Sequence, residues 1–176
     1  MWEAAPAAEM HIREQGLAPT TARAQMTMPR PQPSLKGRAL RLLSQREHSR
    51  RELERKLAEH ETEPGQLAKA LDELQARGFI SEERVVESVI HRRAAKLGTA
   101  RIRQELQSKG LANEAVTEAL ENLRSTELAR AREVWQRKFG EPATDPREKA
   151  RHIRFLVSRG FAAEVVRKVV QGAGDE

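Results

Sequence analysis

The 176-residue sequence contains no cysteine and no tyrosine, and aromatic residues make up only 3% of it. The lack of cysteine excludes disulfide bonds, thiolate metal ligands and cysteine nucleophiles. No apolar run approaches the ~18–20 residues that a membrane-spanning helix needs. The beginning of the chain also lacks the basic start and apolar stretch of a signal peptide. We therefore expect a soluble, cytoplasmic protein that does not associate with membranes.

Residues that could support catalysis are few and scattered. The five histidines show no metal-ligand spacing, and the sequence contains no His-Glu-x-x-His motif and no glycine-rich phosphate-binding loop. Adjacent carboxylates such as Glu82 and Glu83 are expected at an exposed helix start, where they complement the helix dipole. We predict a protein that is not an enzyme and that has no catalytic residue, no metal site and no cofactor.

Charged residues make up 33% of the chain, and the formal net charge is +6. The excess is uneven, because residues 125–176 hold eleven basic and eight acidic residues whereas residues 1–34 hold three of each. A basic excess fits a surface for nucleic acid or for an acidic partner. The alternative is a set of solvated helix faces on which the two signs alternate, and composition alone does not decide between them.

One stretch of the sequence comes close to occurring three times. Residues 100–123 align with residues 150–173 at an offset of 50, which places Leu106 on Leu156, and an offset of 49 in the other direction places it on Leu57. Self-similarity at such a period is typical of repeat proteins. An array also suits the low apolar content of 38%, because each module has to bury only one face against its neighbours.

Apolar spacing within each repeat favours helices, and no segment shows the alternation of a strand. The predicted fold class is therefore all-α: a tandem array of three three-helix (helix-turn-helix-like) modules, nine helices in all, forming a curved, elongated molecule. We place the modules at residues 34–80, 81–124 and 125–176. Residues 1–33 contain five prolines and no sustained periodicity, and we expect them to be a disordered N-terminal extension.

Several local signals predict where helices begin and end. Ser49 and Glu52 have the spacing of a capping box, and Asp145 precedes a proline that suits a first helical turn. A long helix is expected to end at Gly98, with Thr99 capping the next one. Helical spacing assigns Leu128, Ile153 and Val157 to the core. The aromatic residues are likewise assigned to the core rather than to a surface that stacks on bases; they are Trp135, Phe139, Phe79, Phe155 and Phe161.

Three segments together carry a resemblance to a known family. They read Ser49-Arg50-Arg51-Glu52-Leu53-x-x-Lys56-Leu57, Leu74-x-x-x-Gly78-Phe79-Ile80-Ser81-Glu82-Glu83 and Arg92-Arg93-x-x-Lys96-Leu97-Gly98-x-x-Arg101-Ile102-x-x-Glu105-Leu106-x-x-Lys109-Gly110-Leu111. In order, spacing and threefold repetition over about residues 35–173, the sequence resembles the RecX regulators of the bacterial RecA recombinase. The sequence departs from the family pattern at two places. After the Gly78-Phe79-Ile80 turn, family members often have an aspartate, whereas Glu82 and Glu83 stand here. In the helix that follows they often have an aromatic residue, whereas Val85 and Val86 stand here.

The resemblance implies a protein that binds RecA in the groove of its filament on single-stranded DNA. It implies suppression of strand exchange, ATP hydrolysis and co-protease function, and so a role in modulating DNA repair and the SOS response. The implied mechanism is to block filament growth or to bridge neighbouring subunits. Single-stranded DNA would be contacted weakly or through the filament, and we expect the regulator to be a monomer.

Basic clusters recur at similar places in the three predicted modules. They can meet acidic protein surface or phosphates, with an affinity that falls as salt rises. The alternative is that they pair with acids three or four residues away, such as Glu54 or Glu133. The candidate partner-binding residues are Arg50, Arg51, Arg55, Lys56, Arg92, Arg93, Lys96, Arg101, Arg103, Arg130, Arg132, Arg137 and Lys138.

A second function is compatible with short helices in triplets. In a helix-turn-helix-type regulator that reads duplex DNA, one helix of a triplet would enter the major groove. Among the candidate recognition helices only Val165–Gln171 is basic, through Arg167 and Lys168. This alternative predicts specific binding to a duplex site without any recombinase.

Overall fold

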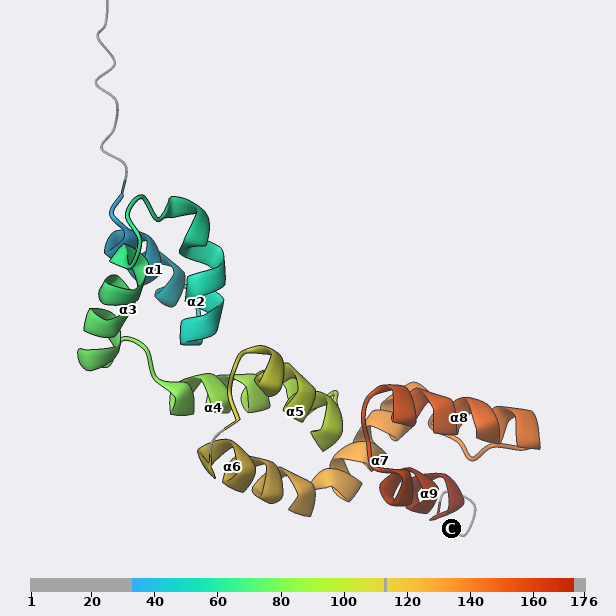
Figure 1. Cartoon of the computed structure of the whole chain (residues 1–176). Helices are drawn as coiled ribbons and strands as arrows, with labels where there is room; N and C mark the ends of the chain where they lie inside the picture. Colours follow the sequence, from blue (N-terminus) through green and yellow to red (C-terminus); the bar gives the residue numbers. More distant parts are fainter. Residues whose placement is uncertain (1–32, 113, 173–176) are drawn as a thin grey trace, which may run out of the picture. The chain divides into compact units, whose positions relative to one another are not determined.

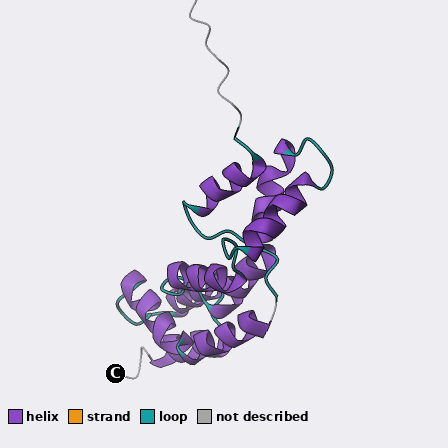
Figure 2. Cartoon of the chain, turned by 90° about the vertical axis from the view of Figure 1, so that its left-hand side faces the viewer, coloured by secondary structure: helices purple, strands orange, loops and turns teal. Residues whose placement is uncertain are grey.

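The structure is a computed structural model that describes residues 33–112 and 114–172. The extension expected at residues 1–33 lies outside the described residues, except for Pro33. All regular structure within the described ranges is helical (Figure 2), which confirms the predicted all-α class. The helices are α1 (Leu35–Leu43), α2 (Arg50–Leu57), the 3-10 helix η1 (Ala58–His60), α3 (Gln66–Ala76), α4 (Glu82–Arg93), α5 (Thr99–Ser108), α6 (Glu114–Ser125), α7 (Glu127–Lys138), α8 (Pro146–Ser158) and α9 (Ala163–Gly172).

The α-helices group in threes, as Figure 1 shows, because each triplet encloses its own hydrophobic cluster. Leu53 and Leu71 lie at the centre of the cluster inside α1–α3, and Ile102 and Leu106 at the centre of the one inside α4–α6. Leu156 is fully buried inside α7–α9. We refer to these triplets as modules 1, 2 and 3. The predicted tandem array of three-helix modules is therefore confirmed.

Two predicted helix starts are formed by the residues that the sequence indicated. The Ser49 hydroxyl accepts a hydrogen bond from the backbone N–H of Glu52 at 3.2 Å, and the Glu52 carboxylate accepts one from the N–H of Ser49 at 3.1 Å. At the start of α8, the Asp145 carboxylate accepts from the N–H groups of Arg147 and Glu148 at 2.7 and 2.8 Å. These predictions are confirmed because capping depends on residues within one turn of each other.

The expected boundary at Gly98 and Thr99 is wrong. Helix α4 already ends at Arg93, and Thr99 is the first residue of α5 rather than its cap. Gly98 occupies the N-cap position, where it has no side chain to offer. The carboxylate of Glu127, in α7, instead accepts the hydrogen bond from the N–H of Thr99 at 3.0 Å. The cap comes from another module, and spacing along the chain cannot reveal such a partner.

The predicted core is correct for Trp135 and Phe161, which are buried, and for Phe139, which packs against the same cluster. Three other assignments are wrong, because the side chains are exposed by 46%, 37% and 51%: Phe79, Ile153 and Val157. Ile80 is buried next to the exposed Phe79. On α8, a buried histidine, His152, shares the inward face with Leu156. Because histidine is polar, a search for regularly spaced hydrophobic residues does not identify the buried face of α8.

Candidate interaction surface

A buried polar contact joins modules 1 and 2, between the start of α2 and the end of α5. The Ser49 hydroxyl donates to the carbonyl oxygen of Lys109 at 2.7 Å. The Lys109 ammonium group donates to the carboxylate of Glu52, also at 2.7 Å, and Arg46 donates to the same carboxylate at 2.9 Å. The side chains of Glu52 and Lys109 are only 6% and 11% exposed. This contact fixes α5 of module 2 against α2 of module 1.

The charge of Glu52 is balanced entirely within this contact. Burial by itself raises the pKa of Glu52, but the hydrogen bonds from Arg46, Lys109 and the N–H of Ser49 oppose burial and lower the pKa to about 2. The carboxylate is therefore ionised at neutral pH and holds two cations. Its role is structural, since its partners are Arg46, Lys109 and the N–H group of Ser49.

Modules 2 and 3 are joined through the backbone. The N–H of Gly98 donates to the carbonyl oxygen of Arg159 at 2.9 Å, and that of Ala100 donates to the carbonyl oxygen of Gly160 at 3.3 Å. A methyl group on Gly98 would overlap the carbonyl group of Gly160. Gly160 itself has φ +81°, and a Cβ atom there would lie 2.6 Å from the Cβ atom of Arg101. The joint therefore requires glycine on both sides.

Arg130, in α7, strengthens the same joint. Its guanidinium group donates to the carbonyl oxygens of Ala94 at 2.9 Å, Leu97 at 2.7 Å and Leu123 at 3.0 Å. These carbonyls follow α4 or lie in the last turn of α6, where helices leave acceptors unsatisfied. Burial lowers the pKa of the half-buried Arg130. The sequence indicated Arg130 as a partner-binding residue, but its donors are occupied by carbonyl groups of the same chain.

Two other predicted binding residues pair with carboxylates of the chain itself. Arg50 binds Glu54 at 2.9 Å and Asp72 at 2.6 Å, and Arg93 binds Glu105 at 2.9 Å. The remaining ten predicted residues are exposed, and none has a carboxylate partner within the described ranges. They are Arg51, Arg55, Lys56, Arg92, Lys96, Arg101, Arg103, Arg132, Arg137 and Lys138.

The structure brings five of these ten residues together around the end of α8. Lys96, Arg137 and Lys138 line a hollow where the end of α4 meets α7 and α8. Arg101 and Arg103 line a second hollow of ≈ 390 Å³ between α5 and α8. The predicted clusters of modules 2 and 3 thus meet at one joint, although they are far apart in the sequence.

The prediction omits two cations that the structure places at the joints, Lys109 and Arg159. Each one directly precedes a glycine with positive φ, Gly110 at 80° and Gly160 at 81°. Each also offers its carbonyl group to the start of a helix in the preceding module. The offset of 50 that aligns them is visible in the sequence, and it is the signal that could have identified both joints.

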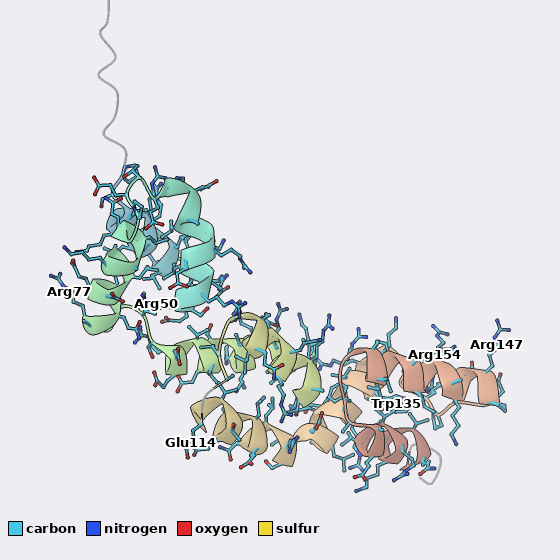
Figure 3. All side chains as sticks on the ribbon, viewed as in Figure 1. Arg50, Arg77, Glu114, Trp135, Arg147 and Arg154 are labelled. Atoms are coloured by element: carbon cyan, nitrogen blue, oxygen red, sulfur yellow. The ribbon has the colours of Figure 1, made fainter. Side chains whose placement is uncertain are left out.

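Trp135 is committed to the interior of module 3, where Figure 3 labels it among α7, α8 and α9. Its indole N–H donates to Nδ1 of His152 at 3.2 Å. The ring of Phe139 lies 3.7 Å, centroid to centroid, from the same imidazole. Burial lowers the pKa of His152, which favours the neutral ring that can accept this hydrogen bond. The indole is therefore not placed to stack on a nucleic-acid base.

Within residues 33–112 and 114–172, no three His, Asp or Glu side chains are arranged to hold a metal ion. None of the helices in these ranges is long and apolar enough to cross a bilayer. The buried polar groups described above instead serve helix ends and joints between modules. The fold is that of a helical-repeat protein with many exposed cations.

Comparison with known proteins identifies the repeat. Models of the first, second and third three-helix domains of RecX match residues 36–74, 81–120 and 125–170. The regulatory protein RecX of Leptothrix cholodnii is 59% identical over 151 residues, which cover 86% of this chain and 96% of the relative. That of Ralstonia nicotianae is 47% identical over 148 residues, covering 84% and 93%. The chain belongs to the RecX family of regulatory proteins.

Solved structures agree on the fold. A crystal structure of RecX from Lactobacillus salivarius superposes with a TM-score of 0.62 at 19% identity, covering 81% of this chain and 96% of that one. A second crystal structure, of a regulatory protein RecX, gives a TM-score of 0.63 at 21% identity, covering 81% and 72%. At such identities the likeness concerns the arrangement of helices alone.

Proposed function

We propose that this protein binds the RecA recombinase in the groove of the filament that RecA forms on single-stranded DNA. By binding there it inhibits the recombinase, ATPase and co-protease activities, and so modulates DNA repair and the SOS response. The observation that carries this proposal is the match of all three RecX domains, in order, over residues 36–170.

The structure supports a mechanism by binding, with no catalytic step. A repeat array presents a continuous series of helix ends and loops to an extended partner. We propose that one molecule acts as a monomer in the cytoplasm, without a cofactor, through modules at residues 34–80, 81–124 and 125–176. Its contact with single-stranded DNA is weak or passes through the filament.

The cations free of internal carboxylates are the residues that we propose to contact the partner. No carboxylate in the described part of the chain forms an ion pair with them, so their charge is available to attract an acidic surface. Arg50, Arg93 and Arg130 are proposed to act on stability instead, because their donors are already engaged. The other ten residues of the predicted set remain the proposed binding surface.

The deciding experiment is a titration of this protein into RecA that is hydrolysing ATP on single-stranded DNA at fixed salt. Loss of hydrolysis at amounts well below one regulator per RecA subunit supports capping or destabilisation of the filament. Loss only at amounts that coat the DNA indicates competition for the strand. No loss at any ratio would refute the proposal, and specific binding to a duplex site without RecA would then favour the helix-turn-helix alternative.

A further inference from the structure

Ion pairs are distributed unevenly along the chain. Every salt bridge between two described residues joins positions from 36 to 109. Module 3 has none within the described part, although residues 125–176 contain eleven basic residues. Cationic side chains that form no salt bridge with another described residue therefore gather on module 3 and at its joint with module 2.

The hollow formed by the connection between α4 and α5, by α7 and by the end of α8, which we call the joint hollow, has a volume of ≈ 210 Å³. Four cations and no acid line it. Its other lining residues are apolar, which gives it an apolar floor and a cationic rim. The lining residues are Ala95, Lys96, Val134, Arg137, Lys138, Phe155 and Arg159. Glu133, one turn before Arg137 on α7, lines a neighbouring hollow and not this one.

Two cations of the rim are held in place by neutral partners. Arg137 donates to the carbonyl oxygens of Ala95 at 2.6 Å and Glu133 at 3.2 Å, across the joint and within α7 respectively. The guanidinium carbon of Arg159 lies 3.7 Å from the centre of the Phe155 ring. Neither contact neutralises the positive charge. Both reduce the side-chain entropy that an anionic partner would otherwise have to remove on binding.

The same contacts distinguish between two kinds of anion. Arg159 covers the Phe155 ring, and Phe139 packs against this ring with centroids 5.1 Å apart at 76°. One face of the ring is therefore covered and is not a free platform for base stacking, which single-strand binders use for affinity, whereas Phe155 still lines the hollow and can contact an aliphatic side chain. An apolar floor of this size fits one aliphatic side chain. A phosphodiester backbone carries no aliphatic side chain that could occupy it. The geometry thus favours a polypeptide over a nucleic acid.

We infer that the joint hollow is a docking site for an acidic polypeptide segment that seats one apolar side chain on Val134 and Phe155. Its flanking carboxylates bind Lys96, Lys138 and Nη1 of Arg137, the terminal nitrogen that makes no hydrogen bond to another described residue, because charge-assisted hydrogen bonds to carboxylates are the strong ones. This inference rests on the proposed function and deepens it, since it assigns the surface and the chemistry by which the partner filament is held.

The first test compares two variants of the full chain that each lose two positive charges. Lys96→Gln/Lys138→Gln removes two of the four cations of the rim. Arg147→Gln/Arg154→Gln removes two cations on the side of α8 that projects away from α9 in Figure 3. We expect the rim variant to bind RecA filaments about tenfold more weakly at low salt. The matched control should bind within about twofold of the unsubstituted chain. Equal binding by both variants and the unsubstituted chain would overturn the inference.

The second test uses probes that do not depend on RecA. A fluorescent glutamate-rich peptide with a central leucine should bind more tightly than the same peptide with serine, and the rim variant should lose this preference. Oligodeoxythymidylate is the competing probe. If it displaces the peptide, and if the rim variant no longer binds it, the site is one for nucleic acid and the inference is wrong. If the unsubstituted chain ignores RecA filaments yet retains the leucine preference, the proposed function fails and the docking site stands.

Discussion

Gly98 and Gly160 meet so closely that neither can be replaced by another residue without moving a module. The carbonyl group of Gly160 occupies the space that a Cβ atom on Gly98 would need. Two backbone hydrogen bonds beside this contact, from Gly98 and Ala100, connect α5 to the end of α8. The joint between modules 2 and 3 therefore depends on the absence of a side chain.

Gly98→Ala tests this contact. The added methyl group has to displace backbone, so we expect a loss of about 1–3 kcal/mol in the free energy of unfolding, as for other overpacked sites. Gly172→Ala is the control, since nothing lies within 4 Å of a Cβ atom at that position. Urea denaturation followed by circular dichroism measures both. A Gly98→Ala protein as stable as the control would show that the modules are not held by this approach.

The low pKa of Glu52 predicts how stability depends on pH. The folded pKa of about 2 lies below the ordinary value of 4.5, so the contribution of Glu52 is complete above about pH 5. It is lost as the pH falls from there toward 2, and it amounts to roughly 3 kcal/mol. Glu52→Gln should therefore be less stable at pH 7, and the difference from the unsubstituted chain should shrink by pH 3. The exposed Glu63→Gln provides the control, and equal pH profiles for the chain and Glu52→Gln would contradict the prediction.

His152 makes a second contribution with the same sign. Its pKa is lowered by burial, so the unfolded chain takes up a proton below about pH 6.5 before the folded chain does, and stability falls as the pH drops through that region. His152→Gln keeps an acceptor for Trp135 but cannot titrate. We expect its melting temperature to change less between pH 7.5 and 5.5 than that of the unsubstituted chain. Identical changes in the two proteins would mean that His152 does not stay neutral in the fold.

Substitutions of Arg130 and Arg132, both on α7, distinguish a role in stability from a role in partner binding. Arg130→Ala leaves the carbonyl groups of Ala94 and Leu97 without the donor that they have in the fold, and we expect it to cost about 1–3 kcal/mol of stability. Arg132→Ala, on the exposed side of α7, should stay within about 0.5 kcal/mol. Thermal melts and filament binding would be measured on the same preparations. A stable Arg130→Ala protein that binds RecA filaments poorly would instead show that Arg130 contacts the partner directly.

Local signals in the sequence predicted local structure well. The caps at Ser49 and Asp145 and the repeated glycine after α5 and α8 all lie within one turn of the helices that they limit. Errors arose where a distant residue, or a polar residue on a buried helix face, decides the outcome. Thr99 is capped by Glu127 from another module, and Ile153 is exposed because His152 takes a place on the buried face of α8.

The candidate surface could be predicted only in part. Basic clusters were visible along the chain, but the sequence could not show which cations the chain neutralises itself. Arg50 meets Asp72 and Arg130 meets Leu97 across helices that only packing brings together. The convergence of Lys96 and Lys138 on one hollow likewise depends on the joint between modules 2 and 3.

The sequence by itself determined the helical class, the threefold repeat and the helix caps, because these follow from the identity of residues a few positions apart. Tertiary structure decided how the modules are joined and which positive charges remain for a partner. The physical reason is that burial, ion pairing and close backbone approach depend on distances in space. Gly98 and Gly160, 62 residues apart in the chain, become neighbours only when α5 meets the end of α8.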